Sequence, residues 1–516
     1  MVLNSRRTFL GNLAGSLLTV GVGASLGGHT AWAFGRDIES FDALQFGDLE
    51  DLAGLLQVMK PSQMLETVTA LLRDGESLDR ITAAATLANA RHFGGHDYTG
   101  YHCLMALMPA WQMSKQLPHR KAALPVLKVL HRQATQMRIV GSRKNEALKS
   151  ELPRPARLER SAAVQQLRAA YVAMDVEAAE AAFAVLVQGD PREALNDLQV
   201  ILHENLDVHR IVLAWRAWES TQLTGTEHAR TLLRQSIRWC IDESKRRDAS
   251  GRRASSLRDL LPELLEEHDL ADGATGTRKL SDADLEASAR RVFAATPEAA
   301  ARHMAELLSK GFAPDDVGAA LSIAANRLVL WDPGRAQADG AEKPKGSIHG
   351  ASVGIHACDS ARAWRDLAAA SNPRNRVACL ISGAYHTAGQ SHRVGNAAVL
   401  DEQAAQDMSQ RTDGNFLEAL RESLQDGHQG RAVEATRQHL KNGGRAHDAF
   451  MVLADTSLDQ SGALHAEKYY WTCWQEFAAA RDAHRHDQLL ALARTTASQV
   501  GAAAPGVDRA RELLKG

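Results

Sequence analysis

Histidine is the residue type in this chain whose number and spacing point to chemistry. There are 21 histidines in 516 residues of otherwise ordinary composition. Six of them form three matched pairs, in which one member lies in each part of the chain at a similar place in a repeated pattern. Because neutral imidazole is a common ligand of zinc, iron and copper, three such pairs favour one shared metal site over unrelated packing roles. The pairs are His102 with His356, His131 with His386, and His209 with His465.

Two of the three pairs have the surroundings that a metal ligand needs. One pair lies inside apolar helix starts that follow a turn, and the other opens two helices that each carry two tryptophans three residues apart. The tryptophan pairs, Trp215 with Trp218 and Trp471 with Trp474, are expected to line an aromatic pocket. The four predicted metal ligands are His102, His209, His356 and His465.

The remaining histidines of interest receive secondary roles. His131 and His386 are predicted to be acid/base groups behind the metal or facing the substrate. His96 and His349 lie at the turns before the first pair of helices, and they are second-rank candidates for metal ligands.

A lysine interrupts the correspondence between the two parts beside one predicted ligand. Val212 in the first part corresponds to Lys468 in the second, one helical turn after His465. On a solvent-facing surface this lysine would be an ordinary charge. Facing the site, a desolvated amine could act as a base or, after carbamylation by carbon dioxide, become an anionic metal ligand.

Helices must position these side chains, because helical periodicity dominates the sequence. Residues 64–72, 285–293 and 416–420 show apolar side chains at three- and four-residue spacing. Runs of alternating β-branched residues are almost absent. The sequence therefore predicts an all-α fold.

The second part of the chain repeats features of the first at a nearly constant distance. Leu71-Leu72 recurs as Leu307-Leu308 and Gly75 as Gly311, both at an offset of 236 residues, which grows to 256 further along. This period is too long for tetratricopeptide-type solenoids. We predict a tandemly duplicated helical unit with approximate internal two-fold symmetry. The predicted segments are a first half at 34–245, a charged linker at 246–280 and a second half at 281–516.

The N-terminus carries an export signal. Ser5-Arg6-Arg7-Thr8-Phe9-Leu10 is a twin-arginine motif, and Ala31-Trp32-Ala33 offers small residues for cleavage. Residues 1–33 are therefore predicted to be a signal peptide that the twin-arginine export machinery recognises, with a periplasmic or secreted destination. The alternative, a membrane anchor, is disfavoured because the apolar stretch is short and glycine-rich. We expect no membrane span in the mature protein.

Composition and missing motifs exclude several classes of protein. With 60 Lys and Arg against 62 Asp and Glu, the chain lacks the basic excess typical of nucleic-acid binders. Its five cysteines form no CxxC motif and predict no disulfide framework. No phosphate-binding glycine loop, HExxH or CxxCH motif is present outside the signal peptide.

Taken in order, the motifs resemble those of the questin oxidase-like family. They comprise the paired histidines near His102, a His-x6-His motif leading into Cys358-Asp359-Ser360-Ala361-Arg362-Ala363-Trp364-Arg365, and His465-Ala466-Glu467-Lys468. The resemblance implies a helical oxygenase of aromatic polyketides with one non-heme iron, held by four histidines and a carboxylated lysine. Carried over residue by residue, it implies that the ligands are His102, His209, His356, His465 and Lys468.

We expect an exported metal-dependent oxidoreductase, a non-heme iron oxygenase of a small aromatic or polyphenolic substrate, with zinc or copper as alternative metals. One alternative function is a zinc-dependent hydrolase, although no Asp or Glu recurs beside the histidine pairs as such a site would require. The other is a non-enzymatic helical scaffold or binding protein, whose histidine pairs remain from a duplication as packing residues.

Overall fold

The computed structural model describes residues 44–93, 98–140, 148, 158–340, 342–350, 352–395, 399, 401–411 and 414–515. The predicted signal peptide at 1–33 and the candidate ligand His96 lie outside these ranges.

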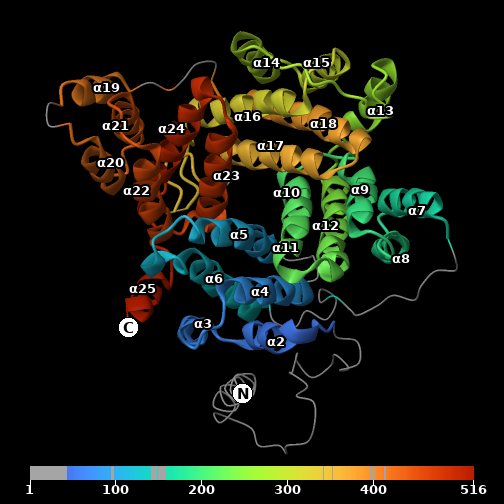
Figure 1. Ribbon diagram of the computed structural model, residues 1–516, viewed down its shortest axis with the longest axis horizontal. Coiled ribbons are helices and arrows are strands. Elements are labelled where there is room, and N and C mark those ends of the chain that lie inside the picture. The colour runs from blue at the N-terminus through green and yellow to red at the C-terminus, as the bar shows by residue number, and fades with distance from the viewer. Residues whose placement is uncertain are drawn as a thin grey trace, which may run out of the picture.

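The described residues form helices joined by turns, which confirms the all-α prediction (Figure 1). In this part of the chain the extended pairing is limited to two isolated bridges, Arg278 with Phe312 and Gln460 with Ala503. Up to residue 249 the helices are α2 (Glu50–Val58), α3 (Pro61–Arg73), α4 (Leu78–Phe93), α5 (Tyr98–Ser114), α6 (Leu124–Val140), α7 (Arg160–Val172), α8 (Val176–Leu186), α9 (Pro191–Leu202), α10 (Val208–Glu219), α11 (Thr221–Thr224) and α12 (Ala229–Ala249). After it they are α13 (Leu257–Glu267), α14 (Asp282–Ala294), α15 (Pro297–Ser309), α16 (Pro314–Leu330), α17 (Val353–Ala370), α18 (Pro373–Ser391), α19 (Glu402–Ser409), α20 (Phe416–Gln425), α21 (Gln429–Lys441), α22 (Ala446–Asp459), α23 (His465–Ala479), α24 (Asp482–Ser498) and α25 (Val507–Lys515). Short 3₁₀ turns are η1 (Gly47–Leu49), η2 (His119–Lys121), η3 (Thr226–His228) and η4 (Gly462–Leu464).

The helices α3 and α15 begin and end with the same chemistry. Each has a proline at its first position, Pro61 and Pro297, where the missing N–H costs no hydrogen bond. After each helix a glycine takes the left-handed conformation, Gly75 with φ 89° and Gly311 with φ 81°. A glycine adopts this conformation without the steric cost that a side chain would add, so the helix can end sharply there.

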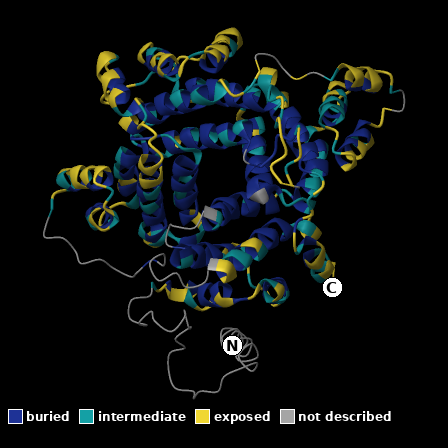
Figure 2. Cartoon of the chain, turned by 180° about the vertical axis from the view of Figure 1, so that it is seen from behind, coloured by how far each residue is buried: buried dark blue, intermediate teal, exposed yellow. Residues whose placement is uncertain are grey.

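Four helices from distant parts of the sequence form a closed frame at the centre of the molecule. Helix α5 contacts α10, α10 contacts α17, α17 contacts α23, and α23 contacts α5 again. Figure 1 shows the four as the sides of a square, and Figure 2 shows them buried along most of their length. Because two sides come from each part of the chain, the frame brings both parts to one centre.

One hydrophobic core runs through both parts of the chain. Buried residues from α2 to α25 belong to a single cluster, so the two parts are not separated by solvent. The predicted linker boundary at 245 falls inside α12, which continues to Ala249, and α13 within the linker packs on α15 and α18. No helix among the described residues is long and apolar enough to cross a membrane.

Candidate metal centre

The frame brings the four predicted ligands together. Ring centroids lie 5.0 Å apart between His102 and His209, 5.4 Å between His209 and His356, 5.2 Å between His356 and His465, and 5.3 Å between His465 and His102. These contacts follow the same closed cycle as the contacts between α5, α10, α17 and α23. The four residues are separated in sequence by up to 363 positions and meet because each lies near the start of its helix.

Burial sets the chemical state of two of the rings. His465 is 3% exposed and His356 is of intermediate exposure, and their Nε2 atoms lie 3.1 Å apart. Burial lowers the pKa of His356 to about 3 and moves that of His465 well below 6.5, with further lowering from neighbouring charges. Both rings are therefore neutral at pH 7, as metal binding requires.

The spacing of the rings matches the ligand shell of one metal ion. Imidazole nitrogens bind such ions at about 2.0–2.1 Å, so two ring centroids at roughly 90–110° around one ion would lie about 4.5–5.3 Å apart. The observed separations, 5.0 to 5.4 Å, lie at or just above the upper end of that range. As they stand, however, no three or more His, Cys, Asp or Glu side chains in the described ranges are arranged so that they could hold a metal ion. The rings have the right spacing, and their donor nitrogens would have to turn toward a common point.

Lys468 lies within the same buried region. It is 3% exposed, and its charge contributes to lowering the pKa values of both His356 and His465. Burial lowers the pKa of Lys468 itself to about 8, and the attraction of the buried Asp359 opposes this shift only in part. Lys468 is therefore a buried residue and does not lie on a solvent-facing surface.

His386 lies behind the four rings, beside the residue that caps α10. Its Nδ1 accepts a hydrogen bond of 3.3 Å from the indole of Trp364, and the ring lies close enough to Asp207 and His356 to interact with them electrostatically when protonated. Burial lowers the pKa of His386 to about 4. Since Nδ1 is the acceptor, the neutral ring carries its proton on Nε2.

The other three candidates lie elsewhere or outside the described ranges. His131, on α6, packs against Gly506 and lines a pocket of about 160 Å³ that also includes Leu464, the residue before His465. His349 has both ring nitrogens engaged, Nδ1 with Ser498 Oγ at 2.9 Å and Nε2 with the Glu342 carbonyl at 2.7 Å. The candidate ligand His349 is thus already hydrogen-bonded at both nitrogens, and His96 has no described placement.

The aromatic side chain against the site differs from the four tryptophans considered in the sequence. Trp239 on α12 makes an edge contact with His209, with centroids 5.6 Å apart, and with Tyr101 at 4.7 Å. Trp474 instead packs with Phe450. Sequence reasoning missed Trp239 because its position in the second part holds Thr495, so the comparison of the two halves gave no signal.

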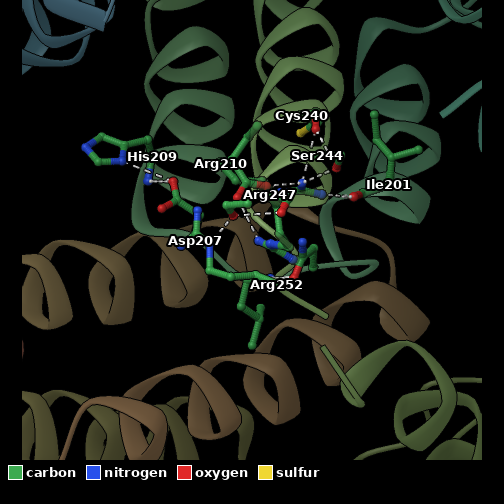
Figure 3. A network of polar contacts seen from close by, with 12 residues as sticks. Ile201, Asp207, His209, Arg210, Cys240, Ser244, Arg247 and Arg252 are labelled. Atoms are coloured by element: carbon green, nitrogen blue, oxygen red, sulfur yellow. Dashed lines mark hydrogen bonds and ion pairs between the residues drawn. The ribbon is translucent and has the colours of Figure 1, made fainter. Parts of the chain in front are cut away.

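Two buried ion pairs anchor the helix starts that carry His209 and His465. Arg210 is 1% exposed, and its guanidinium donates to Glu243 Oε2 at 3.0 Å and to the Ile201 carbonyl at 2.8 Å (Figure 3). At the other helix, Glu467 lies 2.5 Å from the ammonium of Lys128, and the two side chains are 1% and 4% exposed. Arg210, directly after His209, and Glu467, two positions after His465, therefore fix where these two histidines lie.

No known protein family, no curated protein and no solved structure matches the chain.

Proposed function

We propose that the protein is a metal-dependent oxidoreductase, a non-heme iron oxygenase with a small aromatic or polyphenolic substrate, exported through the twin-arginine machinery to the periplasm or beyond. The observation that carries the proposal is the closed cycle of four histidine rings from four helices. The resemblance to the questin oxidase-like family remains a prediction from the sequence and supplies the choice of iron and of substrate class.

In this proposal His102, His209, His356 and His465 hold the metal. One proton between the Nε2 atoms of His356 and His465 satisfies that pair in the metal-free protein. Replacing it with a metal would require the rings to rotate and release the proton.

Lys468 is the proposed fifth ligand. A lysine whose pKa is lowered to about 8 carries a larger fraction of neutral amine at pH 7 than an exposed lysine does, and the neutral amine is the form that reacts with carbon dioxide. The resulting carbamate would be an anion among imidazoles, as a stable iron shell favours. When bound, iron would supply the redox chemistry for dioxygen activation and an open coordination position.

His386 is proposed to move a proton near the substrate. With its proton on Nε2 and a pKa of about 4, it can donate a hydrogen bond at neutral pH but does not carry a charge. Trp239, against His209, is proposed to form part of the wall for an aromatic ring.

We further propose that the two parts of the chain arose by duplication of one helical unit. Helix α15 has the bounds of α3 shifted by 236 residues, and the pairs α2 with α4 and α14 with α16 pack in the same way. The closed frame, with two sides from each part, is what approximate two-fold symmetry would produce.

Metal analysis of protein matured in its native host tests the function. We expect close to one iron per chain, and loss of that iron in His356→Ala but not in the control His484→Ala, which changes a histidine on α24. Zinc in place of iron would favour the hydrolase. Less than a few tenths of an equivalent of any transition metal, together with unchanged thermal stability in excess chelator, would contradict the proposal and favour a scaffold.

A further inference from the structure

Asp207 connects the start of α10 to one of the four rings. Its Oδ1 accepts the backbone N–H of His209 at 2.9 Å, which caps the helix, and lies 3.0 Å from Nδ1 of the same residue (Figure 3). A single carboxylate oxygen therefore fixes both the backbone and the ring of His209.

The contact determines which ring nitrogen of His209 carries the proton. Asp207 Oδ1 already accepts the backbone N–H of His209, so in its contact with the ring the same oxygen is the acceptor and Nδ1–H the donor. With the proton on Nδ1, the lone pair of His209 is on Nε2, the nitrogen on the other side of the ring.

The surroundings keep this arrangement in place. The next residue, Arg210, is bound by groups on α7, α9 and α12, which include Tyr171 Oη at 3.1 Å. The rings of His102 and His356 lie on either side of His209, at centroid distances of 5.0 and 5.4 Å. The start of α10 is therefore held on both sides of His209, by Asp207 before it and by Arg210 after it.

The arrangement is specific to one part of the chain. The residue 256 positions after Asp207 is Ala463, so the second part has no carboxylate at the matched position before His465. A helix cap alone does not explain Asp207, because a cap needs only the contact with the backbone N–H.

We propose that Asp207 is a positioning residue, which holds His209 protonated on Nδ1 and directs Nε2 toward the other three histidines as a metal ligand. The role rests on the proposed function, because it concerns the same metal. Carboxylates behind histidine ligands commonly contribute about 10- to 100-fold to metal affinity by this means.

The first test is the protonation of the ring in the metal-free protein. Histidine labelled with ¹⁵N, with the His209 signals assigned by their absence in His209→Gln, distinguishes a proton on Nδ1 from one on Nε2. We expect the Nδ1 form in the wild type and a change toward the Nε2 form in Asp207→Ala. A wild-type ring protonated on Nε2 would overturn the proposal.

The second test is metal affinity, measured by competition with a chelator. Asp207→Ala should weaken binding by about 10- to 100-fold. Asp207→Asn should lose less, because both contacts use one oxygen that an amide also has, so that it removes the charge and keeps the orientation. The matched control is Asp190→Ala, which removes another aspartate cap whose side chain accepts from the residue two positions later.

The outcomes separate the two proposals. Equal affinity in Asp207→Ala and Asp190→Ala would overturn the positioning role while the metal site stands. A wild-type chain with the Nδ1 proton that binds no metal would overturn the proposed function, and the assignment of the proton would survive.

Discussion

Helices α10 and α23 hold corresponding histidines at the same frame, yet they are secured in opposite ways. Before His209, Asp207 caps α10, and after it Arg210 reaches Glu243 on α12. Helix α23 follows Leu464, whose backbone has φ 63° and is left-handed. After His465, the acidic Glu467 reaches the basic Lys128 on α6.

The difference indicates separate roles for the starts of α10 and α23. The start of α10 places a carboxylate behind the ring and Val212 one turn later, so under the proposed function it would provide a ligand in a fixed position. The start of α23 has Ala463 before the ring and buries an amine, Lys468, one turn after it. A left-handed residue other than glycine costs about 1–2 kcal/mol, so the α23 side tolerates strain that the α10 side does not have. We interpret α10 as the rigid side of the site and α23 as the reactive side.

The largest expected effect is the loss of the anchor of α10. Arg210→Met leaves Glu243 buried beside Arg247 with one cation fewer, and we expect a loss on the order of 3–5 kcal/mol in the free energy of unfolding. Denaturant titration measures it. The control is Arg302→Met, because Arg302 also contacts two carboxylates but is 44% exposed, and it should cost less than about 1 kcal/mol. Similar losses in the two variants would refute the anchoring role.

The anchor of α23 should be weaker. Glu467→Gln leaves the ammonium of Lys128 with the carbonyls of Ser457 and Gln460, at 2.8 and 2.6 Å. We expect a loss of about 2–3 kcal/mol, because a charged hydrogen bond is lost while the cation keeps other acceptors. Lys121→Ala, which removes an exposed pair with Asp455, is the control and should have little effect. A greater loss here than in Arg210→Met would reverse the assignment of the rigid side.

The buried side chain of Lys468 should make the metal-free fold less stable. Because burial lowers the pKa of Lys468 to about 8, the folded state disfavours its ammonium form at pH 7. Lys468→Met should therefore raise the free energy of unfolding in excess chelator by about 1–3 kcal/mol, while it weakens metal binding. The converse substitution Val212→Lys, at the corresponding position of α10, should lower the free energy of unfolding. Unfolding in urea with chelator measures both, and a loss of stability in Lys468→Met would contradict the proposed cost.

The stability of the fold should also depend on pH. The pKa of His386 is about 4 in the folded chain, against about 6.5 when unfolded, so between these values the unfolded chain binds more protons. Stability therefore falls as the pH falls from 6.5 to 4, by about 1.4 kcal/mol per pH unit for this residue. His386→Gln should reduce the slope, and the exposed His119→Gln should not. An unchanged slope in His386→Gln would show that the ring is not held neutral.

The sequence predicted the fold class and the meeting of four histidines for identifiable reasons. Apolar residues at three- and four-residue spacing predict helices, and matched positions in both parts pointed to the four histidines before their helices were placed. The sequence could not predict the closed frame of helices, because the contact of α10 with α17 depends on packing across the whole chain. Trp239 and Asp207 were missed because neither has a counterpart in the other part, and comparison of the two parts detects only what they share.

The most direct measurement is the anomalous scattering of crystals of the native-host protein, recorded on either side of the iron absorption edge. The proposal predicts one iron peak, within bonding distance of a ring nitrogen from each of His102, His209, His356 and His465, with density extending from Lys468. A crystal in which His356 and His465 remain hydrogen-bonded to each other, with no peak among the four rings, would contradict the proposed metal site.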